Sequence, residues 1–295
     1  MSLRLVSPAT FLYLFHEHCT RVTIVSNIFN YLLPFFYFTL VWTYGKAFFA
    51  DKLWAKHAKT PILICTIALH LLSLSVRTIL FRHPPVTTIF EIFTVLACSI
   101  AITYFVIEFR SQHKETGYFI LNIAFFFQLA SSIFIKDTPE VPEILRSPLF
   151  GIHVSSALLG YAAITIAGAY GLMYLMLYHE MKATRFGVVY KKLPTLETLE
   201  RMTFTTVKLA FLLLSIAILF GFIWLHRAID NPNYFDPKLV GTVIVWAMYG
   251  FLVIAKTRYG WKGRKVMILS IIGFLISIFS MTIINIFFSR FHKFY

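Results

Sequence analysis

Residues 204–225, FTTVKLAFLLLSIAILFGFIWL, form an apolar run in which Lys208 is the one charged residue. An α-helix of about 20 apolar residues crosses the hydrocarbon core of a bilayer, because it satisfies its own backbone hydrogen bonds where water is absent. Lys208 lies near the amino-terminal end of the run, so its long side chain can reach the membrane surface. The run therefore predicts a transmembrane helix.

The whole chain has the composition of an integral membrane protein. Of its 295 residues, 58% are hydrophobic and 14% are charged, whereas a soluble domain carries about a quarter charged residues. Apolar runs of helical length recur, and alternating strand patterns are absent. We therefore expect an all-α integral membrane fold, a polytopic bundle of about eight transmembrane helices, with residues 1–295 in a single domain. The expected spans are 23–45, 61–81, 89–109, 118–135, 148–178, 204–225, 239–255 and 266–288.

The distribution of positive charge predicts how the bundle is oriented. The formal net charge is +14. Sixteen basic residues flank the odd-numbered connections between spans: Lys46, Lys52, Lys56, Lys59, Arg110, Lys114, Lys182, Arg185, Lys191, Lys192, Arg201, Lys256, Arg258, Lys262, Arg264 and Lys265. Nine lie on the opposite side: Arg4, Arg21, Arg82, Lys136, Arg146, Arg227, Lys238, Arg290 and Lys293. By the positive-inside rule, the odd-numbered connections are cytoplasmic and both termini are external, N-out and C-out. The surplus charge reflects this orientation, so no nucleic-acid partner is expected.

Two histidines and one loop meet at the predicted external face. His153 lies about one turn into the fifth span, and His292 lies just beyond the eighth. Between them, the segment DNPNYFDPKLVGTVIVW, residues 230–246, begins with Asn and Pro residues that predict turns. Imidazole nitrogen is a common iron ligand, and a porphyrin needs apolar walls. The arrangement favours a haem site in which His153 and His292 bind the iron.

The same external residues also allow plainer interpretations. Tyr234 and Phe235 would lie at the membrane interface, where aromatic side chains are common in any membrane protein. Asp236 stands just before the seventh span, where its carboxylate could cap the helix. His83 and His226 are predicted on the same face, so a zinc site with three or four ligands stays open.

Several ionisable residues lie within or beside the expected spans. His70 falls near the middle of the second span, and Arg77 lies two turns further along the same helix face. Such residues are costly in a membrane and are often functional. We expect His70 either to bind a second haem iron, with Arg77 beside a propionate, or to form a hydrogen bond to a neighbouring helix. Glu91 either binds Arg82, or orients a ligand imidazole, or is an exposed helix-start carboxylate.

The chain shows no motif for catalytic turnover. Its three cysteines lack CxxC or CxxCH spacing, so dithiol chemistry is not expected. No Walker loop, dinucleotide fingerprint or Ser/His/Asp arrangement in a credible setting is present. Binding or regulation is therefore expected rather than an enzymatic reaction.

Four segments resemble those of a known family. They are IHVSSALLGYAAITIAGAYGLMYL (152–175), LETLERMTFTTVKLAFLLLSIAILFGFIW (196–224), YFDPKLVGTVIVWAMYG (234–250) and GWKGRKVMILSIIGFLISIFSMTIINIFFSRFHKFY (260–295), with a weaker match in HLLSLSVRTILFRHPPVTTIFEIF (70–93). The external histidine, the Asp-Pro-Lys core of the loop and the closing Asn and His carry the similarity. The chain resembles the cytochrome c assembly family of haem-handling membrane proteins, with CcsA-like (ResC-like) and HemX-like branches. The match is strongest over residues 148–295.

The chain also departs from that family's pattern. Members that assemble cytochrome c carry tryptophans around the loop aspartate, whereas here Asn233, Phe235 and Gly241 take those places. Leu239 replaces a glutamate, and Ile254 stands where those members carry a histidine inside the next helix. The chain therefore looks nearest to the divergent HemX-like branch.

The resemblance implies a multi-pass protein of the bacterial plasma (inner) membrane that holds haem b non-covalently between His153 and His292. The haem-binding residues it implies or leaves open are His153, His292, Tyr234, Phe235, Asp236, Trp224, Trp246, His70, Arg77 and Arg82. Membrane lipid and a ResB-like assembly protein are the expected partners. One alternative is a HemX-like regulator that contacts glutamyl-tRNA reductase, and another is a solute transporter without haem.

Overall fold

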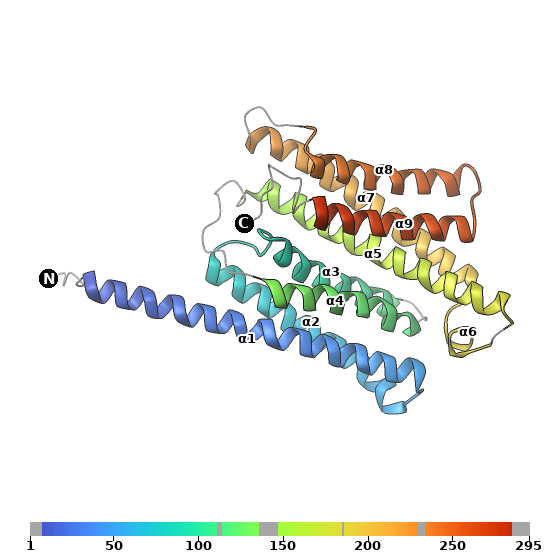
Figure 1. Ribbon diagram of the computed structural model, residues 1–295, viewed down its shortest axis with the longest axis horizontal. Coiled ribbons are helices and arrows are strands. Elements are labelled where there is room, and N and C mark those ends of the chain that lie inside the picture. The colour runs from blue at the N-terminus through green and yellow to red at the C-terminus, as the bar shows by residue number, and fades with distance from the viewer. Residues whose placement is uncertain (1–7, 111–113, 136–146, 185, 229–233, 285–295) are drawn as a thin grey trace.

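Helices form all the regular structure in the part of the chain that the structure describes (Figure 1). The computed structural model describes residues 8–110, 114–135, 147–184, 186–228 and 234–284, with side chains described within these ranges from residue 27 to residue 282. The α-helices are α1 (Pro8–Phe49), α2 (Leu53–Phe81), α3 (Ile89–Arg110), α4 (Gly117–Phe134), α5 (Pro148–Lys182), α6 (Val188–Lys192), α7 (Leu196–Ala228), α8 (Pro237–Thr257) and α9 (Arg264–Phe279). A short 3-10 turn, η1 (Lys114–Thr116), precedes α4, and a π-helical turn, η3 (Ser280–Ile284), follows α9. The expected all-α fold class is confirmed.

Seven helical segments within the described ranges are long and apolar enough to cross a membrane. They are α2, α3, η1 together with α4, α5, α7, α8, and α9 with the start of η3. A polytopic membrane protein is thus confirmed, although the count is seven rather than the eight expected. The expected span 23–45 lies inside α1 but is not among the seven. The side chains of its first four residues, 23–26, lie outside the described part of the chain, so the count of seven does not cover this span in full.

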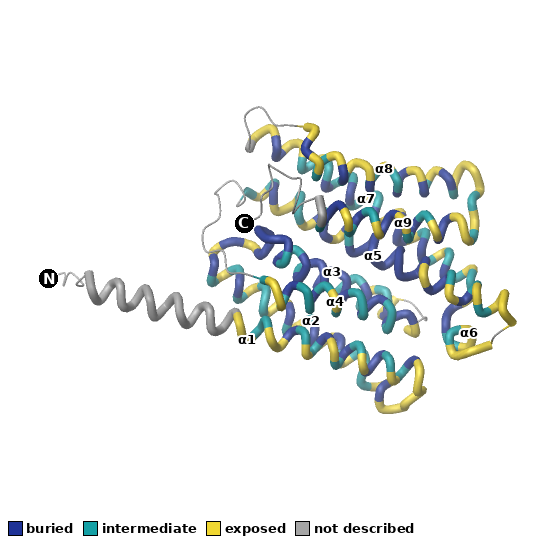
Figure 2. The backbone as a smooth tube through the Cα atoms, in the orientation of Figure 1, coloured by how far each residue is buried: buried dark blue, intermediate teal, exposed yellow. Residues whose placement is uncertain are grey.

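Helix α5 is the central helix of the bundle. In Figure 1, α1 to α4 lie on one side of α5, and α7 to α9 lie on the other. Small residues let α5 approach its neighbours closely: a Cβ added at Gly168 would lie 2.8 Å from Phe274 of α9, and one at Gly160 would lie 3.1 Å from Leu214 of α7. Close van der Waals packing of this kind joins helices in lipid, where the hydrophobic effect does not. The middle of α5 is accordingly buried (Figure 2).

The two ends of the bundle differ in chemistry. One end holds His153, the carboxy-terminal end of α7 and the start of α8, and we call it the histidine end. The other holds the α1–α2 connection, η1, α6 and the α8–α9 connection, and we call it the basic end (Figure 1). Fifteen of the sixteen basic residues assigned to the cytoplasm are described, and they belong to elements at the basic end. The fold therefore gathers the predicted cytoplasmic charges at one end.

Candidate functional site

A hydrogen bond from one of its own ring nitrogens holds the imidazole of His153 against α7. Helix α5 begins at Pro148, after Ser147, whose Oγ accepts a hydrogen bond from the backbone N–H of Phe150. One turn further on, His153 Nδ1 lies 2.8 Å from the carbonyl oxygen of Ala217. A carbonyl oxygen only accepts hydrogen bonds, so Nδ1 carries the proton and Nε2 keeps its lone pair. Metal-binding histidines in proteins usually have this arrangement.

Gly221 provides the space for that imidazole. A Cβ added at Gly221 would lie 2.7 Å from His153 Nδ1 and 2.8 Å from Cε1. Any larger residue here would push the ring away from Ala217 and weaken the hydrogen bond. The glycine on α7 and the histidine on α5 therefore form one structural unit.

Two small cavities adjoin this histidine. Their volumes are about 70 and about 110 Å³, and both are lined by His153, Ile218, Lys238 and Thr242. Trp224, Phe222 and Leu239 help close the first, whereas Phe150, Tyr161 and Met281 help close the second. The walls are mostly apolar, so Lys238 and His153 are the polar groups that a ligand would meet first. The sequence identified Lys238 as a charge and as part of the Asp-Pro-Lys core of the loop, but not its place beside His153.

Asp236 has the capping role that the sequence allowed. It is the N-cap of α8, and its Oδ1 accepts a hydrogen bond from the backbone N–H of Lys238 at 2.9 Å. The side chain is buried, and Pro237 follows it at the first helical position. Such a cap fixes where the helix starts and orients its first turn. Asp236 thereby positions Lys238 at the two cavities.

The aromatic residues predicted to bind a ligand are spread over three places. Trp224 lines the first cavity and packs on Phe150, with ring centroids 5.1 Å apart. Tyr234 instead donates a hydrogen bond to Nε2 of His226 at 2.8 Å, and Phe235 beside it is 84% exposed. Trp246 lies deeper, where its indole N–H donates to Ser215 Oγ at 2.8 Å. Of these four aromatic residues, only Trp224 lines either described cavity.

His70 lies inside the bundle with both ring nitrogens engaged. Its Nε2 is 3.0 Å from Thr94 Oγ1, and its Nδ1 is 2.9 Å from the Tyr37 hydroxyl. Thr94 donates to Gln128 Oε1, and Gln128 Nε2 donates to Ser132 Oγ. The threonine proton is therefore used, so Nε2 of His70 donates to Thr94 and Nδ1 accepts from Tyr37. In this arrangement His70 has no free nitrogen for iron, which agrees with the hydrogen-bonding alternative.

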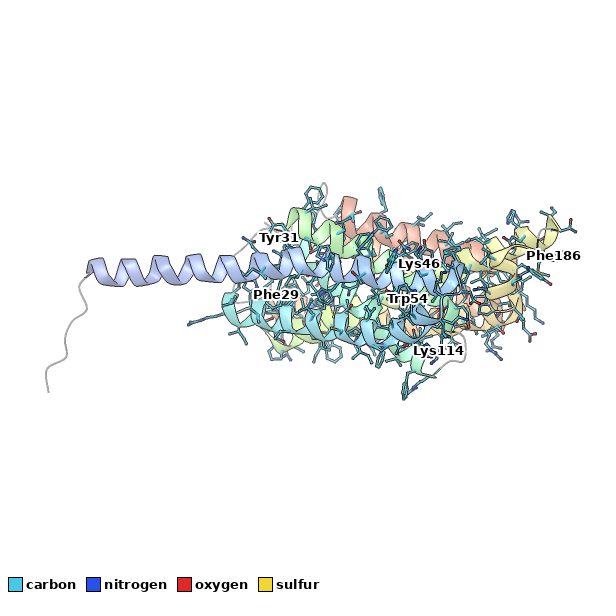
Figure 3. All side chains as sticks on the ribbon, turned by 90° about the horizontal axis from the view of Figure 1, so that it is seen from below. Phe29, Tyr31, Lys46, Trp54, Lys114 and Phe186 are labelled. Atoms are coloured by element: carbon cyan, nitrogen blue, oxygen red, sulfur yellow. The ribbon has the colours of Figure 1, made fainter. Side chains whose placement is uncertain are left out.

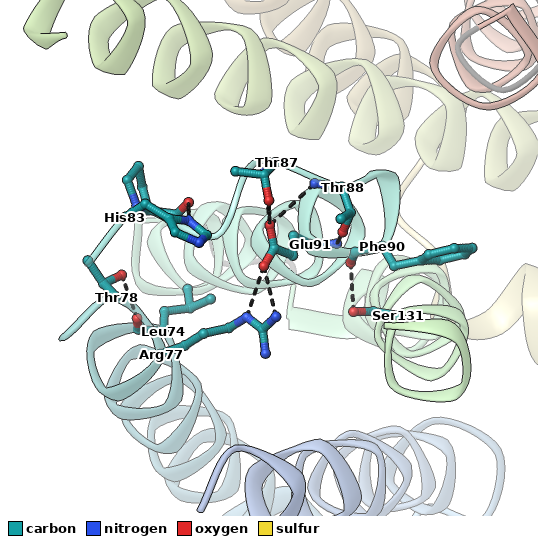
Figure 4. A network of polar contacts seen from close by, with 10 residues as sticks. Leu74, Arg77, Thr78, His83, Thr87, Thr88, Phe90, Glu91 and Ser131 are labelled. Carbon is teal, nitrogen blue, oxygen red and sulfur yellow. Dashed lines mark hydrogen bonds and ion pairs between the residues drawn. The ribbon is translucent and has the colours of Figure 1, made fainter. Parts of the chain in front are cut away.

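Arg77 is bound by Glu91 near the histidine end (Figure 4). Glu91 Oε1 accepts from Arg77 Nε at 3.0 Å and from Nη2 at 2.8 Å. Glu91 Oε2 accepts from the N–H and hydroxyl of Thr87 and from the N–H of Thr88. Thr88 Oγ1 in turn accepts from the N–H of Glu91, which forms a capping box at the start of α3. Glu91 is thus a buried helix-start carboxylate, and its expected pairing with Arg82 is wrong: Arg82 is exposed at the carboxy-terminal cap of α2.

The structure therefore brings together only part of the predicted site. His153 and Trp224 share a cavity wall, whereas His70, Arg77 and Trp246 lie elsewhere in the bundle. His292 lies outside the described residues. No group of three or more His, Cys, Asp or Glu residues suitable for a metal ion occurs in the described part of the chain. Gly221 was also missed, because its importance depends on a contact with His153 that is 68 positions away in the sequence.

Comparison with known proteins identifies the family. The family model described as cytochrome C assembly protein matches residues 10–292. The chain is 24% identical to the cytochrome c biogenesis protein CcsA of Trieres chinensis over 285 residues, 84% of this chain and 89% of that protein. It is 23% identical to CcsA of Heterosigma akashiwo, over 69% of this chain and 74% of that protein. It is 29% identical to Protein HemX of Brevibacillus brevis, over 59% of this chain and 64% of that protein. With a family match over almost its whole length, this chain belongs to the cytochrome c assembly protein family.

Proposed function

We propose that the chain holds haem b non-covalently at its histidine end, with His153 and His292 as the axial ligands of the iron. The observation that carries the proposal is the hydrogen bond from His153 Nδ1 to Ala217, which leaves the Nε2 lone pair available beside two cavities. Membership of the cytochrome c assembly family supports haem as the ligand. The part assigned to His292 rests on the sequence, because this residue lies outside the described ranges.

The described residues fit one edge of a haem. The cavities of about 70 and 110 Å³ are far smaller than the roughly 300–1,000 Å³ of sites that enclose a small molecule. Most of the macrocycle would therefore extend beyond the described walls, on the side where Tyr234 and Phe235 are exposed. Bound haem would supply an iron porphyrin for transfer or storage. The chain would bind the iron through His153 and pair a propionate with the ammonium group of Lys238.

The family and the charge distribution support a proposed location and orientation for this site. We place the protein in the bacterial plasma membrane, with the histidine end outside and the basic end in the cytoplasm. A ResB-like membrane protein is the proposed partner if the haem is passed on to a cytochrome. The similarity to a relative named Protein HemX favours a second candidate function, in which the basic end contacts glutamyl-tRNA reductase and regulates tetrapyrrole synthesis.

The visible spectrum of the purified full-length protein tests the proposal. We expect a Soret band and a low-spin spectrum from the wild type, and loss of haem or a high-spin spectrum from H153A and from H292A. H226A is the matched control, because His226 lies at the same end but binds Tyr234 and lines neither cavity. A wild-type spectrum from the H153A/H292A double variant would refute the ligand assignment. Co-purification of the reductase with a protein that has no Soret band would favour the second candidate.

A further inference from the structure

A large cavity opens at the basic end, far from His153. Its volume is about 500 Å³. Four segments that are distant in the sequence line it: the end of α1, the start of α2, η1 and α6. The lining residues are Tyr44, Ala47, Phe48, Asp51, Lys56, Lys59, Lys114, Glu115, Lys191 and Lys192. The cavity therefore joins the first half of the bundle to the connection between α5 and α7.

The lining carries an excess of positive charge, with five lysines against two carboxylates. Asp51 forms ion pairs with Lys56 at 2.8 Å and with Lys192 at 2.9 Å. Hydrogen bonds and attraction from these two lysines lower the pKa of Asp51 to about 2, so this carboxylate is fully ionised at neutral pH and already engaged. The cavity still has a surplus of three positive charges, which an anionic ligand would neutralise.

The other three lysines differ in how they are held. The ammonium group of Lys59 donates to the carbonyl oxygen of Lys114 at 3.0 Å and lies 5.3 Å from the centre of the Tyr44 ring. Lys114 and Lys191 are exposed, and within the described ranges neither makes an ion pair. Lysine binds phosphate as a compact point charge with three donors, without the planar geometry that arginine imposes. Lys114 and Lys191 are thus placed to bind phosphate oxygen atoms.

The surroundings of the cavity have the character of a membrane interface. Tyr44, Ala47 and Phe48 form an apolar wall at the end of α1. Large aromatic side chains are exposed at the same end, including Phe49, Trp54 and Phe186, and Figure 3 labels Trp54, Lys114 and Phe186 toward this end of the molecule. Exposed aromatic residues of this kind lie at the depth of lipid headgroups. Basic pockets at the cytoplasmic ends of transmembrane helices suit anionic headgroups.

We propose that this cavity binds the phosphate headgroup of an anionic phospholipid and that the bound lipid joins α6 to the α1–α2 hairpin. Within the described ranges, the ion pair of Asp51 with Lys192 links these two parts through side chains. A headgroup between Lys114 and Lys191 would add a second link and neutralise the surplus charge. Its glycerol and first acyl carbons would lie against Tyr44 and Phe48. A lipid is favoured over a soluble phosphate compound because of this apolar wall.

The test measures lipid binding to the full-length protein in micelles of a zwitterionic detergent. Phosphatidylglycerol and phosphatidylcholine are titrated separately, and binding is followed by native mass spectrometry and by the shift of the thermal unfolding midpoint. The variant is K114Q/K191Q. The matched control is K262Q/K265Q, which removes the same charge at the same end from residues that do not line the cavity.

We expect phosphatidylglycerol to raise the unfolding midpoint of the wild type and phosphatidylcholine to have little effect. K114Q/K191Q should bind phosphatidylglycerol about 30-fold more weakly, from the usual contribution of two lysines at an anionic surface. The control should bind like the wild type. Equal weakening in both variants would overturn the proposal in favour of general surface attraction. Competition by inorganic pyrophosphate, with equal stabilisation and no lipid adduct, would overturn it in favour of a soluble phosphate ligand.

If K114Q/K191Q does not fold, single variants K114Q and K191Q keep the test decisive. Each should weaken phosphatidylglycerol binding about fivefold, while the unfolding midpoint without lipid stays at the wild-type value. That midpoint should not move, because neither ammonium group makes an ion pair within the described ranges. Wild-type lipid binding in both single variants would exclude the cavity as the site.

Discussion

Substitution of Glu91 by glutamine should destabilise the protein more than any ordinary surface change. The carboxylate is fully buried, and its two oxygens accept five hydrogen bonds, two from Arg77 and three from the Thr87–Thr88 turn. Glutamine keeps one acceptor oxygen and presents N–H donors where the second oxygen was. Either Arg77 or the turn therefore loses its acceptor. The side chain of Arg77 is 7% exposed, so its charge stays buried in both cases.

The magnitude follows from this geometry. Removing one partner of a buried ion pair costs about 3–5 kcal/mol, because an uncompensated charge is left behind. The E91Q variant should fall in that range. The double variant R77M/E91Q removes the charge as well as the carboxylate, so it should lose only about 1–2 kcal/mol from the lost hydrogen bonds and cap. The double variant should therefore be more stable than E91Q by roughly 2–3 kcal/mol, so the effects of the two substitutions should not add.

The assay is the free energy of unfolding in mixed micelles, obtained by titration with sodium dodecyl sulfate and followed by far-UV circular dichroism. The wild type, E91Q, R77M and the double variant form a complete double-mutant cycle. A loss of less than 1 kcal/mol in E91Q, or effects of the single variants that simply add, would show that the buried pair does not stabilise α2 against α3.

Three further predictions concern the histidine end and the basic end. G221A should displace the His153 imidazole, because the added methyl group would lie 2.7 Å from Nδ1, and haem titrations should show binding about tenfold weaker. Unchanged haem binding would contradict the packing of Gly221 against His153. D236A should lose the cap of α8 and about 1 kcal/mol of unfolding free energy, whereas D236N, which can still accept the hydrogen bond, should lose less. The pKa of Asp51 is lowered to about 2 in the folded protein, from an ordinary value near 3.8. The stabilising contact of Asp51 with Lys192 is therefore present above about pH 4 and is lost as the pH falls from about 4 to 2. Protease cleavage near α6 should increase over this pH range in the wild type but not in D51N.

The fold could be predicted from the sequence because a backbone inside the bilayer must satisfy its own hydrogen bonds, which few structures allow. Each apolar run of about 20 residues had to become a helix, and six of the eight expected spans lie wholly inside observed helices. The expected span 118–135 ends one residue beyond α4, and 266–288 extends past the described residues. The predicted ends of the spans were less accurate, because a helix can continue beyond its apolar run into the water on either side of the bilayer. Helix α7 thus begins at Leu196, after Thr195, whose Oγ1 accepts from the N–H of Thr198. The expected span began eight residues later, at residue 204.

The candidate site could be predicted only in part, because local patterns do not specify contacts between helices. Asp236 was expected as a cap from its place before an apolar run, and the structure confirms that role. For Glu91 the sequence left three roles open, and the arginine it named was Arg82 rather than Arg77, because both are near Glu91 in the sequence and only the direction of α2 separates them. The proximity of Lys238 and Gly221 to His153 arises where α5, α7 and α8 meet. The spacing of residues within one segment of the sequence does not indicate this proximity.

The hydrogen-bonded chain through His70 has a consequence for how the first four helices assemble. Tyr37, His70, Thr94 and Gln128 come from α1, α2, α3 and α4 in turn, and every hydrogen points the same way, ending on Ser132. A one-residue slide or a rotation of α2 or α3 would break two of these hydrogen bonds at once, and the same movement of α1 or α4 would break one. Apolar packing of leucine and phenylalanine in lipid tolerates such slides, whereas these directed hydrogen bonds form in only one alignment of the helices. This row of hydrogen bonds therefore specifies a single relative position for the four helices.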